Sequence, residues 1–235
     1  MIKENLALCR KKLEAAAAKA GIPSSQITLV AVTKGVASDL INEAIDNGIT
    51  HIGENRVQEA LCKYDAANEY VRKKGVRLTW HMIGHLQTNK VKEAVGMFDL
   101  IHSVDSLHLA EEIDRQAQNA SKPQDVLIEV KTSPEATKYG IAPAELLTTI
   151  QKILVFKNIV VRGLMTVAPL GNDTEKTRTF FRLLKELKDN INRSGICPSP
   201  LSILSMGMTD DFQVAVEEGA TMVRLGRAIF TERKE

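Results

Sequence analysis

The sequence predicts a single α/β domain over residues 1–235, folded as a closed (β/α)8 TIM-type barrel with an extra N-terminal helix. Short apolar runs alternate with amphipathic helical stretches about eight times, as such barrels require. The apolar runs are continuous, which is typical of parallel strands covered by helices. A doubly wound open sheet is the alternative, but no Gly-x-Gly-x-x-Gly turn follows the first strand.

The elements follow one another in a regular order. Residues 3–20 are predicted to be helical because Leu6, Leu13 and Ala17 fall near helical spacing, and Gly21 with Pro23 ends this helix. The predicted strands are the apolar runs 28–34, 51–55, 78–84, 98–104, 125–132, 158–167, 201–207 and 221–226. The predicted helices between them cover 38–48, 55–74, 87–96, 106–120, a segment from Pro143, 173–194, 210–218 and a short tail.

Composition excludes several functional classes. With 31 basic and 29 acidic residues the net charge is +2, too balanced for a dedicated nucleic-acid binder. No apolar run approaches the roughly 20 residues of a membrane helix, and the charged N-terminus lacks the features of a secretory signal. Cys9, Cys62 and Cys197 form no CxxC pattern. We therefore expect a cytoplasmic protein with no nucleic-acid or membrane partner, and a monomer because no heptad or long apolar edge is present.

Lys34 is the sharpest candidate for chemistry. It follows the apolar run 29–33, so it would stand at the C-terminal mouth of the barrel, where barrel enzymes place their active sites. Partial desolvation there would leave a fraction of the lysine as free amine, which forms Schiff bases with aldehydes. A salt-bridged lysine without a covalent role is the competing interpretation.

The last two strands end in turns that suit an anion. Ser205 and Gly207 precede one predicted helix, and Gly226 with Arg227 opens another. Barrels commonly hold phosphate after strands seven and eight. A Schiff-base lysine opposite a phosphate cradle indicates a phosphorylated aldehyde, and pyridoxal 5′-phosphate is the obvious candidate cofactor.

Arg224 would line the same end of the barrel, two residues before Gly226. An arginine does not readily give up its proton. If it donates to the pyridine nitrogen, that nitrogen stays unprotonated, and the ring becomes a poorer electron sink than one paired with an aspartate.

Two other sequence patterns give only weak evidence for a functional site. His81 and His85 lie four apart, a zinc-binding spacing on a helix, but here they lie on a strand and turn with no third ligand, so we expect no metal. No Gly-x-Ser-x-Gly elbow accompanies a Ser/His/Asp order.

Several long motifs in one order resemble the pyridoxal phosphate homeostasis protein family, whose barrel is shared with the N-terminal domain of alanine racemase. The matching stretches are VAVTK (30–34), HIGENRVQE (51–59), WHMIGHLQTNK (80–90), SVDS (103–106), EATKYG (135–140), GLMTVAP (163–169), SMGMTDDFQVAVEEGAT (205–221) and VRLGRAIF (223–230). The resemblance covers nearly the whole chain.

The resemblance implies that Lys34 carries pyridoxal phosphate as a Schiff base and that Arg224 lies near the pyridine nitrogen. It places Asn55, His81 and Met165 around the cofactor. It also implies that Ser205, Gly207 and the turn at Gly226 and Arg227 hold the phosphate. The sequence departs from the family pattern at Thr209, where serine is usual, at Arg227, where a small hydroxyl residue is common, and at Thr231, where glycine often follows.

Alanine racemase adds a β-rich second domain and an opposing catalytic tyrosine. The tyrosines of this sequence, Tyr64, Tyr70 and Tyr139, are not clearly placed as such a base. We therefore expect a non-enzymatic protein of intracellular vitamin B6 homeostasis that holds pyridoxal phosphate and transiently contacts recipient apoenzymes. The alternatives are a weak amino-acid racemase and a Schiff-base aldolase without pyridoxal phosphate.

Overall fold

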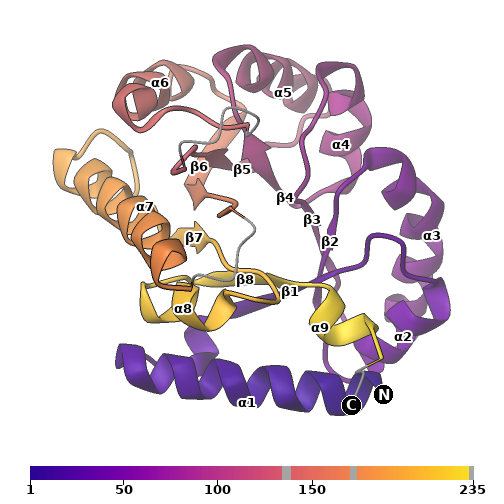
Figure 1. Cartoon of the computed structure of the whole chain (residues 1–235). Coiled ribbons are helices and arrows are strands. Elements are labelled where there is room, and N and C mark those ends of the chain that lie inside the picture. The colour runs from indigo at the N-terminus through magenta and orange to yellow at the C-terminus, as the bar shows by residue number, and fades with distance from the viewer. Residues whose placement is uncertain (134–138, 170–173, 233–235) are drawn as a thin grey trace.

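The computed structural model, which describes residues 1–133, 139–169 and 174–232, is a closed barrel of eight parallel strands in sequence order (Figure 1). The first strand pairs with the last, and Val30 stands opposite Arg224 in that register. Helices surround the strands, and a further helix precedes β1. The predicted TIM-type barrel with an extra N-terminal helix is thus confirmed.

The strands are short and lie close to the predicted apolar runs. Their bounds are β1 Thr28–Val32, β2 His51–Glu54, β3 Thr79–Met82, β4 Leu100–Val104, β5 Gln124–Glu129, β6 Ile159–Met165, β7 Ile203–Ser205 and β8 Met222–Leu225.

The helices fill the connections, and 3-10 turns occur among them in the described residues. The helices are α1 Ile2–Ala20, α2 Ser38–Asp46, α3 Val57–Lys73, α4 Val91–Met97, α5 Leu107–Asn119, α6 Leu146–Ile153, α7 Thr174–Ser194, α8 Phe212–Glu217 and α9 Arg227–Phe230. The 3-10 turns are η1 Ser24–Gln26, η2 Thr88–Lys90 and η3 Pro143–Glu145. Pro143 starts its turn as predicted, although α6 itself begins three residues later.

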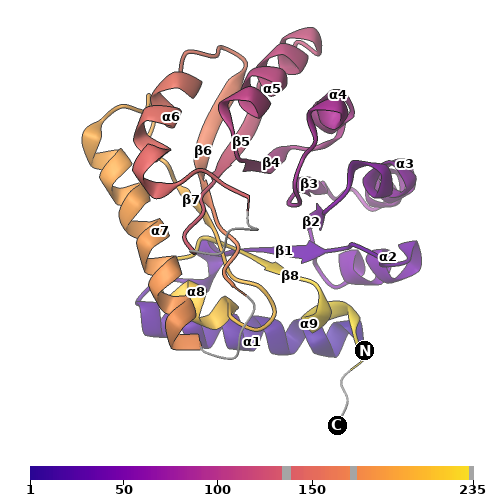
Figure 2. The same cartoon turned by 45° about the horizontal axis from the view of Figure 1, so that its top comes forward.

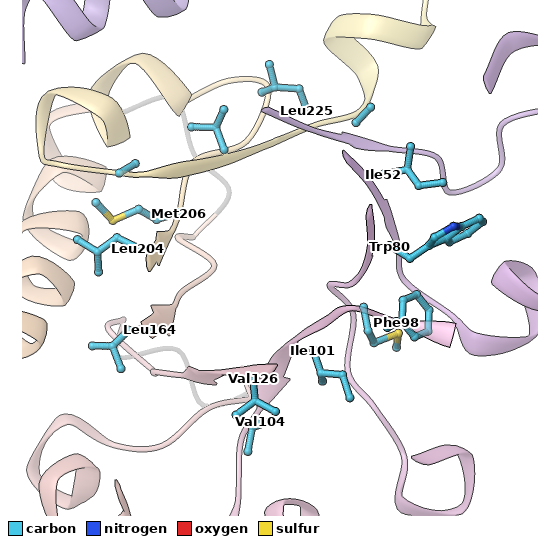
Figure 3. Packing of buried hydrophobic residues seen from close by; sticks show 14 of the residues in the cluster. Ile52, Trp80, Phe98, Ile101, Val104, Val126, Leu164, Leu204, Met206 and Leu225 are labelled. Carbon is cyan, nitrogen blue, oxygen red and sulfur yellow. The ribbon is translucent and has the colours of Figure 1, made fainter. Parts of the chain in front are cut away.

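Side chains alternate between two separate layers because successive strand residues point to opposite faces. Trp80, Leu164 and Leu225 lie on the outer side of the strands and face the helices in Figure 3. A smaller apolar cluster of strand residues fills the inside of the barrel: Val30, Leu100, Leu127, Met165 and Met222. The interior therefore has an apolar part, and polar strand residues occupy the remaining inward positions.

Helix α1 packs on the outer layer of helices. It runs beneath α8 and α9 in Figures 1 and 2. Leu6 is fully buried, and the Asn5 side-chain amide donates to the carbonyl oxygens of Ile229 (2.9 Å) and Thr231 (3.2 Å). Gly21 ends the helix with a φ of 70°, a left-handed conformation that glycine adopts without steric cost.

Within the described residues, no helix is long and apolar enough to cross a membrane. The same part of the chain contains no group of three histidine, cysteine, aspartate or glutamate side chains arranged to hold a metal ion.

If residues 1–235 form one domain, truncating α1 should destabilise the entire barrel. Leu6→Ala should lower the free energy of unfolding by about 2–5 kcal/mol, because it leaves a cavity in a buried layer. Urea unfolding followed by circular dichroism and by Trp80 fluorescence would measure this. The two signals should shift together, whereas Leu61→Ala at a 48% exposed position should shift them far less. A separate early transition for α1 would contradict the single domain.

Candidate functional site

A cavity of about 820 Å³ opens at the C-terminal ends of the strands. This volume lies within the range of roughly 300–1,000 Å³ that small-molecule sites occupy. The cavity is bordered by Val32, Lys34, Gly35, Val36, Asn55, Ile83, Val167, Pro169, Thr177, Met208, Thr209, Asp210, Asp211, Arg224, Gly226, Arg227, Phe230 and Thr231. The structure therefore brings together five predicted site residues: Lys34, Asn55, Arg224, Gly226 and Arg227.

Lys34 lies two residues beyond β1, at the cavity. The sequence predicted a partly desolvated amine, but Lys34 is exposed, so this expectation is wrong for the protein without ligand. The strand ends at Val32 and the chain then turns outward, which is why burial of the preceding apolar residues does not extend to Lys34.

The backbone on both sides of Lys34 is held by a cluster that the sequence analysis missed. The Lys63 ammonium on α3 donates to the Thr33 carbonyl oxygen (2.7 Å) and to the carboxylates of Glu54 (2.9 Å) and Glu59 (2.8 Å). Glu59 in turn accepts a hydrogen bond from the Gly35 amide. The Glu59–Lys63 spacing of four residues on one helix is the sequence signal for part of this cluster.

Glu54 is the buried centre of that cluster. Its side chain is fully buried, and one carboxylate oxygen accepts from the Thr33 hydroxyl (2.6 Å) as well as from Lys63. Burial raises the pKa of Glu54 above its ordinary value, although the bonds from Lys63 and Thr33 oppose the shift. For Glu59 the same burial is outweighed by its bonds to Lys63 and Gly35, which lower its pKa.

Arg224 crosses from β8 into the barrel and is 4% exposed. Its guanidinium donates through Nη1 to the Ser205 hydroxyl (2.5 Å) and through Nη2 to the Thr166 carbonyl oxygen (2.8 Å). Burial lowers the pKa of Arg224 to about 10, with Glu129 and Asp211 opposing the shift. The guanidinium is therefore charged near neutral pH and can only donate hydrogen bonds.

Ser205 lies beneath Arg224 rather than at the cavity wall. It is fully buried, and its hydroxyl lies 3.0 Å from His102 Nδ1 as well as against Arg224. The sequence predicted that Ser205 belongs to a phosphate cradle, but in the structure its hydroxyl contacts the buried guanidinium of Arg224. That assignment stays a prediction, and the contacts favour a different role, supporting Arg224.

Gly207 is needed to form the turn between β7 and α8. It has a φ of 93°, and a Cβ there would lie 2.6 Å from the Ala215 Cβ. Gly207 is buried and so is Met165, which lies among the apolar side chains inside the barrel. Neither residue borders the cavity, so their predicted cofactor contacts also stay predictions.

Thr209 borders the cavity at the end of this turn, and the sequence analysis noted it only as a departure from the family pattern. Its hydroxyl oxygen accepts from the Ala228 amide (3.3 Å), which leaves the hydroxyl proton free to donate elsewhere. Arg227 pairs with Asp210 (2.5 Å) at the same rim. Thr209, Arg227 and the Gly226 turn thus form part of the polar wall of the cavity, beside Asp210 and Asp211.

His81 is buried on β3, with one ring nitrogen 2.9 Å from His51 and the other 2.9 Å from His102. Burial, and to a smaller extent the neighbouring His51, lower the pKa of His81 to about 3. The pKa of His102 is likewise lowered, first by burial and then by His81 and Arg224. Both rings are therefore neutral near neutral pH.

The residues present suit pyridoxal phosphate as a ligand. The cavity offers an amine at Lys34, a buried cationic donor at Arg224 and a polar rim at Thr209, Gly226 and Arg227. An aldehyde, a pyridine nitrogen and a phosphate are the groups that these side chains match.

Comparison with known proteins also points to pyridoxal phosphate as the ligand. Residues 5–234 match the family described as alanine racemase, N-terminal domain. A pyridoxal phosphate homeostasis protein of Aquifex aeolicus is 42% identical over 98% of this chain and 98% of its own length. One of Bos taurus is 36% identical over 90% of this chain and 79% of its own.

Solved structures extend the comparison. PipY of Synechococcus elongatus, with pyridoxal phosphate bound, has a TM-score of 0.84 and 35% identity, covering 98% of this chain and 100% of PipY. An alanine racemase of Clostridium difficile shares the fold with a TM-score of 0.73 and 15% identity, covering 100% of this chain and 57% of the racemase.

Breaking the ion pairs of Lys63 with Glu54 and Glu59 should destabilise the folded protein. Lys63→Met should lower the free energy of unfolding by about 3–5 kcal/mol, because Glu54 would remain buried without its ionic partner. Urea unfolding near neutral pH measures the loss. Lys73→Met, which removes an exposed pair with Glu69, is the matched control and should leave the midpoint nearly unchanged. Equal effects of the two substitutions would contradict a stabilising role of the cluster.

The neutral histidines should make stability depend on pH. Unfolded His81 binds a proton with a pKa of 6.5, whereas the folded ring does so with a pKa of about 3. Its contribution is therefore present above pH 6.5 and is lost as the pH falls toward 3, at up to about 1.4 kcal/mol per pH unit. Urea unfolding between about pH 7 and pH 5 should show this slope. His81→Gln should make the slope smaller, with the remainder contributed by His51 and His102, whereas the exposed His108→Gln should leave it unchanged.

Proposed function

This chain belongs to the pyridoxal phosphate homeostasis protein family, and from that premise we propose that it binds pyridoxal 5′-phosphate at the cavity described above. Its role is intracellular vitamin B6 homeostasis, in which it holds and delivers the cofactor without a reaction of its own. The observation that carries the proposal is that Lys34, two residues beyond β1, and Arg224, on the paired strand β8, border one cavity.

Pyridoxal phosphate supplies an aldehyde that condenses with a primary amine, forming a C=N bond and releasing water. Lys34 Nζ is the amine of the proposal, because Lys34 borders the cavity and is exposed there. The Lys63 cluster fixes the main chain at Thr33 and Gly35, so Lys34 extends from a rigid base. That rigidity lowers the entropy lost when the ligand is attached.

Arg224 orients the other end of the ligand ring. Its bonds to Ser205 and Thr166 hold the guanidinium in one plane, and its charge makes it a donor toward an unprotonated ring nitrogen. Such a donor favours holding the cofactor over strong electron withdrawal by the ring. Thr209, Arg227 and the Gly226 turn provide donors for the phosphate in this proposal.

The absence of catalysis is supported by the cavity wall. Among the described residues that border the cavity there is no tyrosine. Tyr64 packs against Trp80, Tyr70 bonds to Asp46 and Tyr139 stacks on His85. A tyrosine acid or base of the kind that alanine racemase places opposite its lysine is therefore missing from the described wall, so racemase turnover should be poor.

The remaining parts of the proposal concern the setting. Cys62 and Cys197 are free thiols, which favours a reducing cytoplasm. A monomer fits the placement of exposed large apolar side chains on different elements, such as Leu61 on α3 and Leu147 on α6. Delivery of the cofactor implies transient contact with recipient apoenzymes.

Covalent attachment is tested by adding pyridoxal phosphate and reducing with borohydride. The intact mass should rise by one reduced pyridoxal phosphate, and peptide mapping should place it on Lys34. Lys34→Ala should lose both the imine absorbance and the mass gain, whereas the exposed Lys157→Ala should keep them. Incubating the loaded protein with L-alanine should give no enantiomer exchange. Exchange that depends on Lys34 would establish the racemase instead.

The phosphate contacts are tested separately. Thr209→Val should weaken retention of pyridoxal phosphate roughly tenfold, because it removes a hydrogen bond to a charged group. The imine absorbance should survive at saturating ligand, since Lys34 is untouched. Equilibrium dialysis measures retention, and the exposed Thr179→Val on α7 is the matched control. Unchanged retention in Thr209→Val would remove Thr209 from the phosphate site.

A further inference from the structure

Five polar side chains form a continuous hydrogen-bonded series across the inside of the barrel. We call this series the interior chain, and its members are His51, His81, His102, Ser205 and Arg224. His51 Nδ1 lies 2.9 Å from His81 Nε2, and His81 Nδ1 lies 2.9 Å from His102 Nε2. His102 Nδ1 lies 3.0 Å from the Ser205 hydroxyl, which accepts from Arg224 Nη1. The members come from β2, β3, β4, β7 and β8, so only barrel closure assembles them.

The interior chain joins the two ends of the barrel. Arg224 borders the main cavity at the C-terminal ends of the strands. His51 is the first residue of β2, is half-buried, and borders a second cavity of about 420 Å³ with Thr28 and Thr50, at the N-terminal ends. The His51 end of the interior chain is thus open to water, while His81, His102 and Ser205 are buried.

The hydrogen bonds of this chain run in one direction. Arg224 can only donate, so Ser205 Oγ is its acceptor. The described partners of the buried Ser205 hydroxyl are Arg224 and His102, so its proton has one favourable target, His102 Nδ1. The alternative would leave a buried hydroxyl proton unsatisfied, which is costly.

The direction of the Ser205 hydrogen bond also sets the tautomer of each histidine ring in turn. When His102 accepts at Nδ1, its Nε2 carries the proton and donates to His81 Nδ1. His81 then donates from Nε2 to His51 Nδ1, which leaves the His51 Nε2 proton facing outward. All three rings are neutral in this order, in agreement with the lowered pKa of each.

Few other charges act on the interior chain. Asp99 acts on His51 and opposes the lowering of its pKa by burial. Glu129 and Asp211 act on Arg224. The order of the chain therefore depends mainly on its own hydrogen bonds.

We propose that His51, at the opposite end of the barrel from the ligand, is a positioning residue for the Ser205–Arg224 pair, acting through His81 and His102 as a directionally ordered chain. His51 terminates the chain by accepting from His81. Without that acceptor His81 and His102 lose their single tautomer, Ser205 loses its fixed orientation, and Arg224 is held less firmly toward the ring nitrogen. The inference rests on the proposed function only for its ligand-binding readout.

The test uses ring-nitrogen NMR of the full chain labelled at histidine. Without ligand, His81 and His102 should both be neutral with the proton on Nε2. His51→Phe removes the terminal acceptor and should give mixed tautomers at His81 and His102. His51→Asn places a carbonyl oxygen near the position of Nδ1 and should restore the single tautomer. The exposed His108→Asn is the control and should change nothing.

Binding provides the second readout. The dissociation constant for pyridoxal phosphate should rise about three- to tenfold in His51→Phe, the scale of one hydrogen bond, and return toward the original value in His51→Asn. A proton on Nδ1 of His81 or His102 in the unsubstituted protein would overturn the proposal, even if His51→Phe failed to fold. Tautomers or affinity indifferent to His51→Phe would also overturn it. Failure of the unsubstituted protein to bind pyridoxal phosphate would instead refute the proposed function, and the tautomers would still report on the chain.

Discussion

Pairing of β1 with β8 is the constraint on which the rest of the structure depends. It closes the sheet and sets Val30 opposite Arg224, so Lys34 and the Gly226 turn meet at one cavity although they are far apart in the chain. The same closure brings β7 and β8 around to face β3 and β4 across the interior. An open sheet with the same strands would separate β4 from β7 and leave His102 without Ser205.

Closure also changes what a buried polar side chain costs. Arg224, His81, His102 and Ser205 are inside the barrel, where each would be unfavourable alone. They are tolerated because each has a partner from another strand. The inside of the barrel thus contains an apolar cluster around Leu127 and the interior chain, which leads to the ligand cavity.

The site is shaped by two kinds of support. On one side, the ion cluster of Lys63, Glu54 and Glu59 fixes the main chain around Lys34 from outside the barrel. On the other, Ser205 and Thr166 hold Arg224 from inside. Rigid support of this kind suits a protein that retains a cofactor, because little conformational freedom remains to be lost on binding.

The sequence by itself determined the barrel, the number and order of its strands, and Lys34, Asn55, Arg224, Gly226 and Arg227 as neighbours at one end. These follow from local apolar runs and from the rule that strand ends of a barrel meet. Tertiary structure alone decided that Lys34 is exposed, that Ser205 supports Arg224, and that Lys63 holds the Lys34 turn. The reason is physical: burial and hydrogen-bond partners depend on which side chains from other strands and helices arrive in the same space, and no local pattern records that.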